Sequence, residues 1–205
     1  MFIKYLIKYV VIHSLNMVYC MLDSHKTGDK LKNDCFFYLK KLSQTSLLLC
    51  DALENKTNYD PSRLLKESKL QKEQCIDYSV KTFMPPINRE DIVTLSLLLH
   101  RLNINIASVI FFKNQNYPSA DILKQLSGLH SAVIKADKAL DNKLSLKTVN
   151  TLSNEQSYDD HPLFNNNFTT SSVISAYNLF SKIDRCENLA WQICDYLVRT
   201  AVKNS

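Results

Sequence analysis

The stretch VISAYNLFSKIDRCENLAWQICDYLVRTA, residues 173–201, decides the fold class. Its apolar residues recur with the roughly 3.6-residue period of an α-helix and form one stripe along it. The stripe consists of Val173, Tyr177, Phe180, Ile183, Ala190, Cys194, Leu197 and Ala201. Because such a stripe has to be buried against another apolar surface, the stretch predicts a long helix within a helical bundle.

The rest of the chain repeats this helical pattern in shorter segments. They span residues 34–53, 62–82, 89–113 and 118–140. Polar or proline-containing turns separate them, and no segment alternates as a β-strand does. Asn88 is the predicted N-cap of the third segment, which places Glu90 and Asp91 in the first turn, where the helix dipole favours negative charge. Residues 155–160 predict a further short helix.

The glycine content excludes several fold and function classes. Gly28 and Gly128 are the only two glycines among 205 residues. The GxGxxG fingerprint, the P-loop and the GxSxG elbow all need glycines close together, so these nucleotide-binding and hydrolase motifs are absent. A hydrophobic fraction of 45% and a charged fraction of 22% are ordinary for a globular protein. Gly128 lies inside the fourth helical segment, where it permits close helix packing.

Charge and cysteine usage favour a cytoplasmic protein that does not bind nucleic acid. The net charge is +5, and the basic residues are dispersed, with Lys40–Lys41 as the densest pair. A nucleic-acid footprint usually shows clustered Lys and Arg. The six cysteines include no CxxC pair, so a structural zinc site is not indicated. Four lie among apolar residues, as buried reduced thiols do: Cys35, Cys50, Cys186 and Cys194.

The N-terminal segment differs from the rest of the chain. Residues 1–22 are apolar behind Lys4 and Lys8, and a polar linker containing Gly28 follows. We therefore divide the chain into an N-terminal apolar segment and linker, residues 1–29, and a helical bundle, residues 30–205. Three interpretations of residues 1–22 stay open: an amphipathic helix on a membrane or on the bundle, an uncleaved signal-like anchor, or an extension upstream of the true start.

The sequence predicts no catalytic residues and no cofactor-binding residues, so we expect a non-enzymatic protein. The five histidines are dispersed, and no nucleophile–base set is recognisable. His100 follows an apolar run and is expected to be partly buried and hydrogen-bonded. Carboxylates one helical turn apart can hold a cation or simply form a solvated face. Three such pairs occur: Glu73 with Asp77, Glu155 with Asp159, and Asp184 with Glu187.

Two stretches carry a resemblance to a known family. KTFMPPINREDI at 81–92 resembles a segment of the PhoU-like family encoded beside low-affinity inorganic phosphate transporters, in which a helix ends in a Lys-Thr-Phe-like tripeptide before a proline turn and an acidic helix start. IDRCENLAWQICDYLVRTAVKNS at 183–205 resembles the last helix of that family. The resemblance implies an all-α, PhoU-like antiparallel bundle of about six helices, to which the apolar N-terminal helix is an addition.

The resemblance also implies metal ligands in the second half of the chain. Family members hold metal clusters through Glu/Asp-x-x-x-Asp motifs, and the second half keeps Glu155, Asp159, Asp184 and Glu187, with Asn188 where the family usually has Asp. These four residues are the predicted ligands of a divalent or trivalent ion such as Zn, Fe or Mg. The corresponding first-half acids are replaced by Leu65, Lys69, His100 and Arg101, so a first-half site is expected to be lost.

By this resemblance the function is that of an accessory or regulatory protein of inorganic phosphate transport. The implied partner is a membrane phosphate transporter, which places the chain in the cytoplasm or at the inner face of the membrane, with residues 1–22 as one route to peripheral association. Self-association stays open. The alternatives are a metal-binding helical protein that uses only the second-half acidic motifs, and a degenerate structural or interaction bundle that has lost metal binding.

Overall fold

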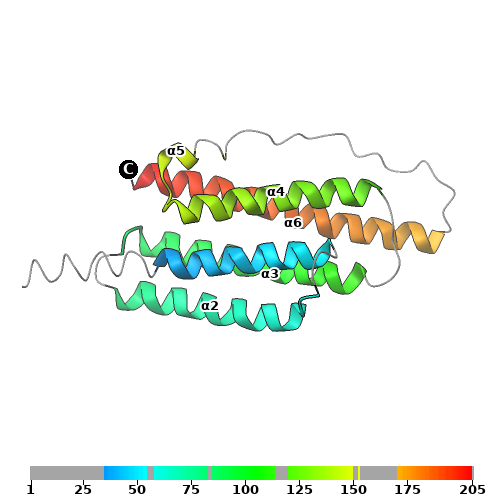
Figure 1. The fold of residues 1–205 in the computed structure, drawn as a ribbon, viewed down its shortest axis with the longest axis horizontal. Helices are drawn as coiled ribbons and strands as arrows, with labels where there is room; N and C mark the ends of the chain where they lie inside the picture. The colour runs from blue at the N-terminus through cyan, green and yellow to red at the C-terminus, as the bar shows by residue number, and fades with distance from the viewer. Residues whose placement is uncertain are drawn as a thin grey trace, which may run out of the picture.

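The computed structural model describes residues 35–54, 58–82, 85–113, 120–149, 152 and 170–204. These residues are almost entirely helical and contain no strand, which confirms the all-α fold class. Residues 35–53 form the first described helix, drawn in blue without a label in Figure 1. The labelled helices are α2 (Pro61–Lys81), α3 (Arg89–Lys113), α4 (Ala120–Asp141), α5 (Leu146–Val149) and α6 (Thr170–Lys203).

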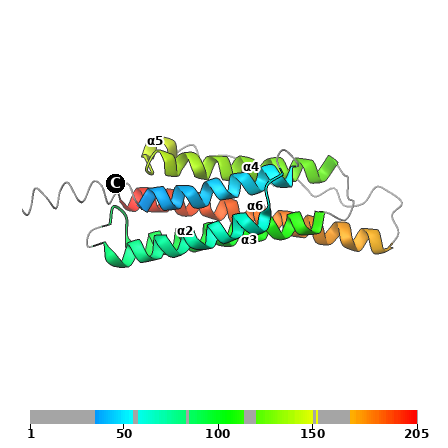
Figure 2. The same ribbon diagram turned by 60° about the horizontal axis from the view of Figure 1, so that its bottom comes forward.

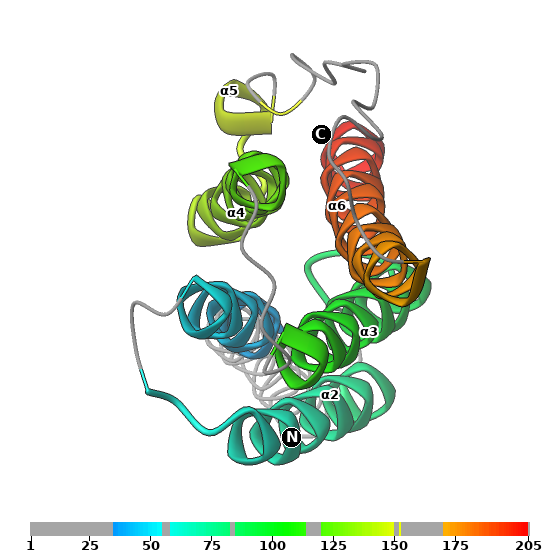
Figure 3. The same cartoon turned by 90° about the vertical axis from the view of Figure 1, so that its right-hand side faces the viewer.

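The helices lie side by side in two layers. Seen end-on, α6, α3 and α2 follow one side of the molecule, and α4 and helix 35–53 follow the other (Figure 3). Helix 35–53 is antiparallel to α4, since Lys40 pairs with Asp141 and Glu54 meets His130. It also runs beside α2 and α3 (Figure 2). Helix 35–53 is therefore covered on most of its circumference by three other helices.

The consecutive long helices α4 and α6 run parallel to each other. Gly128 faces Glu187, and the carbonyl oxygen of Ala132 accepts a hydrogen bond from the Cys194 thiol at 3.5 Å. The end of α4 and the start of α6 consequently lie at opposite ends of the bundle (Figure 1). Of the intervening chain the structure describes α5, a four-residue helix that periodicity did not predict. The predicted helix at 155–160 lies outside the described residues.

The helix boundaries in the described chain follow local capping chemistry. The Asp60 carboxylate accepts a hydrogen bond from the backbone N–H of Ser62 at 2.9 Å, and Pro61 takes the first helical position of α2, where its missing N–H costs nothing. The predicted start of α3 is confirmed, because the helix begins directly after Asn88 and the Ile92 N–H donates to the Asn88 carbonyl at 3.1 Å.

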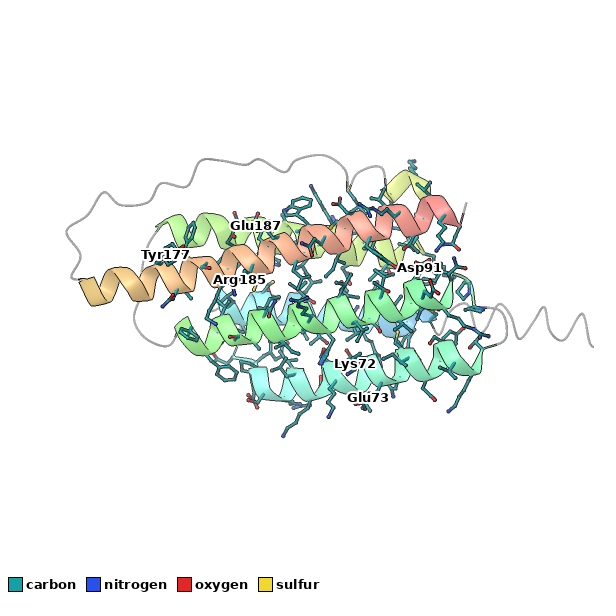
Figure 4. All side chains as sticks on the ribbon, turned by 180° about the vertical axis from the view of Figure 1, so that it is seen from behind. Lys72, Glu73, Asp91, Tyr177, Arg185 and Glu187 are labelled. Atoms are coloured by element: carbon teal, nitrogen blue, oxygen red, sulfur yellow. The ribbon has the colours of Figure 1, made fainter. Side chains whose placement is uncertain are left out.

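The apolar stripes form one core, although some of their members lie outside it. Buried residues include Leu39, Leu49, Leu99, Ile106, Leu129, Ile183 and Leu197. The apolar residues Phe37, Leu70 and Val80 of the predicted segments 34–53 and 62–82, and Tyr177 of the predicted stripe, are instead 51%, 56%, 71% and 53% exposed. Tyr177 lies toward the start of α6, near the end of α3 and the start of α4 (Figure 4). The other three lie at helix positions that face away from neighbouring helices.

The described cysteines are all buried and free of disulfide bonds, which confirms the predicted burial of Cys35, Cys50, Cys186 and Cys194. They are Cys35, Cys50, Cys75, Cys186 and Cys194. Burial raises the pKa of Cys75 to about 12 and the pKa of Cys186 to about 12, so these thiols stay protonated at neutral pH. Thiols of this kind act as small apolar side chains rather than as nucleophiles.

A buried carboxylate ties the start of α3 to the end of α6. Asp91, which is 6% exposed, accepts a hydrogen bond from the Tyr196 hydroxyl at 2.8 Å and another from the Lys203 ammonium at 3.3 Å. Beside it, the Arg89 guanidinium donates to the Thr82 carbonyl at 2.9 Å and closes the α2–α3 turn. These contacts give Arg89 and Asp91 structural roles at this end of the bundle.

We expect Tyr196→Phe to destabilise the protein by about 1–3 kcal/mol, because it removes a hydrogen bond to a buried carboxylate and leaves the rest of the ring in place. Chemical denaturation measures the change. Tyr177→Phe on the same helix is the matched control, since Tyr177 is 53% exposed, and it should stay within about 0.5 kcal/mol of the native chain. Equal effects of the two substitutions would show that the Asp91 contact contributes nothing.

Candidate functional site

Two of the four predicted metal ligands lie one turn apart on α6. Asp184 accepts a hydrogen bond from the Asn188 side-chain amide at 3.1 Å. Glu187 is pressed against α4, and a Cβ added to Gly128 would lie 2.4 Å from its Oε1. Figure 4 shows Glu187 on the side of α6 that faces α4, and Arg185 on the side that faces α3. The predicted role of Gly128 in close packing is confirmed by this contact.

The position of Glu187 makes its negative charge costly. Burial raises the pKa of this carboxyl, and the neighbouring charge of Asp184 raises it further, while a hydrogen bond with Trp191 acts in the opposite direction. The Lys135 ammonium lies over the Trp191 ring, 5.0 Å from the ring centroid. A cation beside Asp184 and Glu187 would relieve the repulsion between the two carboxylates.

The α6 pair fits a metal only as part of a larger ligand set. The described residues hold no group of three or more His, Cys, Asp or Glu side chains arranged for a metal ion. Glu155 and Asp159, the other two predicted ligands, lie outside the described residues. If they complete the site, these four carboxylates would supply the oxygen ligands that hard cations prefer. Metal analysis tests this, since equal metal content in the native chain and in Asp159→Asn/Asp184→Asn would contradict it.

Among the positions of the replaced first-half acids, Lys69 of α2 and His100 of α3 lie near each other. The His100 Nδ1 lies 2.8 Å from the Ser68 hydroxyl. Burial lowers the pKa of His100, and the charges of Lys72 and Lys69 lower it further, against an opposing effect of Glu73. The region is thus rich in positive charge. The exposed pair Glu73 and Asp77 takes no part in a ligand cluster in the described chain, and Asp77 instead accepts a hydrogen bond from Lys81 at 2.7 Å.

Sequence reasoning missed a buried polar network that includes His100. Asn103 is fully buried; its Oδ1 accepts a hydrogen bond from Ser46 at 2.6 Å, and its Nδ2 donates to the Ser68 hydroxyl at 2.9 Å. The network thereby joins helix 35–53, α2 and α3. The sequence carried one signal, because Asn103 lies four residues after Leu99 and three before Ile106, within the apolar stripe. A polar residue at such a position has to find buried partners.

A second histidine contact was also missed. His130 of α4 lies between two carboxylates at the end of helix 35–53: its Nδ1 is 3.0 Å from Glu54 Oε1, and its Nε2 is 3.8 Å from Asp51 Oδ1. Sequence spacing could not predict this contact, because His130 and Glu54 are 76 positions apart. The contact fixes the register between helix 35–53 and α4.

The polar side chains of Ser68, His100 and Asn103 form hydrogen bonds between helices. The Ser68–His100 pair resembles a nucleophile and its base, but Ser68 is 0% exposed, so its hydroxyl cannot reach a substrate. The Ser68 hydroxyl also accepts a hydrogen bond from the side-chain amide of Asn103, which is itself buried. Within the described chain, these interior polar side chains hold helix 35–53, α2 and α3 together.

No protein-family model matches the chain, and no curated protein matches its sequence. The resemblance of residues 81–92 and 183–205 to the PhoU-like family therefore stays a prediction, and the function has to be argued from the geometry and the residues themselves.

We expect Glu187→Gln to stabilise the protein at neutral pH. A carboxyl whose pKa is raised in the folded state binds its proton more tightly there, so the stability of the native chain falls as the pH rises from about 4.3, the ordinary Glu value, through the folded pKa. Gln removes this loss. Urea denaturation at a series of pH values should show a flatter profile for Glu187→Gln, whereas Asp195→Asn, at an exposed position on the same helix, should leave the profile unchanged.

Gly128→Ala is expected to depend on the residue at position 187. In a helix interior, Ala is favoured over Gly by about 1 kcal/mol. In the native chain the new methyl group displaces the Glu187 carboxylate, which lies 2.4 Å from its position, and part of the gain is lost. In a Glu187→Ala background the full gain should appear. A double-mutant cycle measures the difference, and additive effects would refute the contact.

Proposed function

We propose that the chain is a PhoU-like accessory or regulatory protein of inorganic phosphate transport, which acts by binding a membrane phosphate transporter and not by catalysis. The proposal places it in the cytoplasm, at the inner face of the membrane. Its first support is the sequence resemblance of residues 81–92 and 183–205, and its second is the all-helical architecture of the described chain.

One structural observation carries the proposal further than the two stretches taken separately. The stretches that resemble the family lie against each other, because Asp91 of the first accepts hydrogen bonds from Tyr196 and Lys203 of the second. Two similarities that were independent in sequence thereby become one packed unit. Such a unit is what a shared fold would require of both stretches at once, which favours relatedness over chance similarity.

The distribution of polar groups supports binding as the mode of action. The described interior is occupied by hydrogen-bonded side chains such as Asn103 and by protonated thiols, which leaves its surfaces for recognition. A regulatory partner of a transporter needs exposed helix faces rather than a reactive cleft. The helices α2, α3 and α6 lie next to one another along one side of the bundle and could offer such helix faces to a partner (Figure 3).

Co-purification tests the proposal. A tagged full-length chain, solubilised from native membranes, is expected to bring down a phosphate transporter, and deletion of the gene is expected to change phosphate uptake. Tyr196→Phe with lowered stability should weaken both effects in proportion to the folded protein present. A tagged chain that never retains a transporter, together with unchanged uptake after deletion, would overturn the proposal.

A further inference from the structure

The outer face of α3 exposes a row of large apolar side chains. Leu97, Ile104 and Phe111 are 48%, 46% and 53% exposed. Because they are spaced seven residues apart, they lie on one face of the helix and extend over about 21 Å. We call these three residues the α3 stripe. The helix is long and apolar enough to cross a membrane by length and composition alone, yet its inner face is part of the bundle core.

Basic side chains accompany the α3 stripe on its α6 side. Arg101 is exposed on the same face, between Leu97 and Ile104. The Lys182 ammonium of α6 donates to the Ser108 hydroxyl at 3.4 Å and lies 4.4 Å from the centroid of the Phe112 ring. Arg185, one turn further along α6, is exposed and lies on the side of α6 that faces α3 (Figure 4).

The α2 side of the α3 stripe is basic as well. Lys72 lies between α2 and α3 (Figure 4), and Lys72 and Lys69 are both close enough to His100 to lower its pKa. The acids near this face are Glu73, which follows Lys72, and Glu90, which lies in the first turn of α3 and seven residues before Leu97. The face therefore has an apolar centre with an excess of positive charge around it.

We propose that this face binds the surface of a membrane rich in anionic lipids. The α3 stripe would enter the boundary between headgroups and acyl chains, as the apolar side of an interfacial helix does, and the surrounding Lys and Arg side chains would reach the headgroup phosphates. The inference builds on the proposed function, because it names the surface that approaches the membrane, but lipid binding itself requires no transporter.

Charge decides against two other occupants of the face. A second copy of the chain, placed face to face, would bring Arg101, Lys182 and Arg185 against the same basic residues. Residues 1–22 of the same chain carry Lys4 and Lys8 and no acid, so they would also meet like charge. Anionic lipid complements the basic margin and the apolar centre together.

Vesicle co-sedimentation of the full-length chain tests the inference. Binding is expected to vesicles of phosphatidylcholine mixed with phosphatidylglycerol, to be much weaker on phosphatidylcholine alone, and to fall with added salt. Arg101→Gln/Arg185→Gln should reduce the partition coefficient on the anionic vesicles by about tenfold or more. Leu97→Gln/Ile104→Gln/Phe111→Gln should reduce it on both vesicle types. All five positions are exposed, so thermal unfolding should show that both variants keep their fold.

Matched controls remove the same charge or the same apolar area elsewhere. Lys138→Gln/Lys147→Gln and Phe37→Gln/Leu70→Gln change exposed residues that do not belong to this face, and these variants should bind as the native chain does. Equal losses in test and control variants, or native-level binding by the test variants, would overturn the inference. The vesicles contain no transporter, so such a failure leaves the co-purification result unaffected, and failed co-purification leaves vesicle binding intact.

Discussion

The carboxylate of Asp91 is the constraint on which the arrangement of α2, α3 and α6 depends. Burial of an ionisable group is costly unless hydrogen bonds compensate it, and here both donors come from the last turns of α6. Lys203 is 112 residues away along the chain, so the contact forms only when α6 keeps its full length and register. Arg89 adds a local bond to Thr82 that holds the turn in which Asp91 sits.

Small residues at the interface of α4 and α6 permit the close approach of the two helices, and this approach has an electrostatic consequence. Gly128 and Ala132 let the two helices approach closely enough for Glu187 to meet the α4 backbone and for Cys194 to donate a hydrogen bond to it. The same approach withdraws the Glu187 carboxylate partly from water and raises its pKa. Helix packing and the charge state of the predicted metal ligand are thus coupled through one glycine.

Local features of the fold could be predicted from the sequence, whereas its pairings could not. The start of α3 after Asn88 and the burial of Cys186 follow from capping and apolar spacing, which act within one helix. The partners of Asn103 depend on how three helices meet, which no spacing along one of them records. The four residues of α5 are too few to show a helical period. Phe37 is apolar but lies on the exposed side of its helix. Its neighbour Phe36 is buried, because successive residues of a helix point in directions about 100° apart.

The candidate site shows the same division between what is local and what is not. Asp184 and Glu187 were predictable as neighbours because one helical turn separates them, but the contact of Glu187 with Gly128 required the tertiary structure. The α3 stripe is the converse case. α3 is packed against α2, α6 and helix 35–53, and its one outward strip could be polar without loss to the core. Large apolar side chains at that strip cost solubility and add little to folding, so their presence between basic side chains favours the proposed contact with a membrane surface.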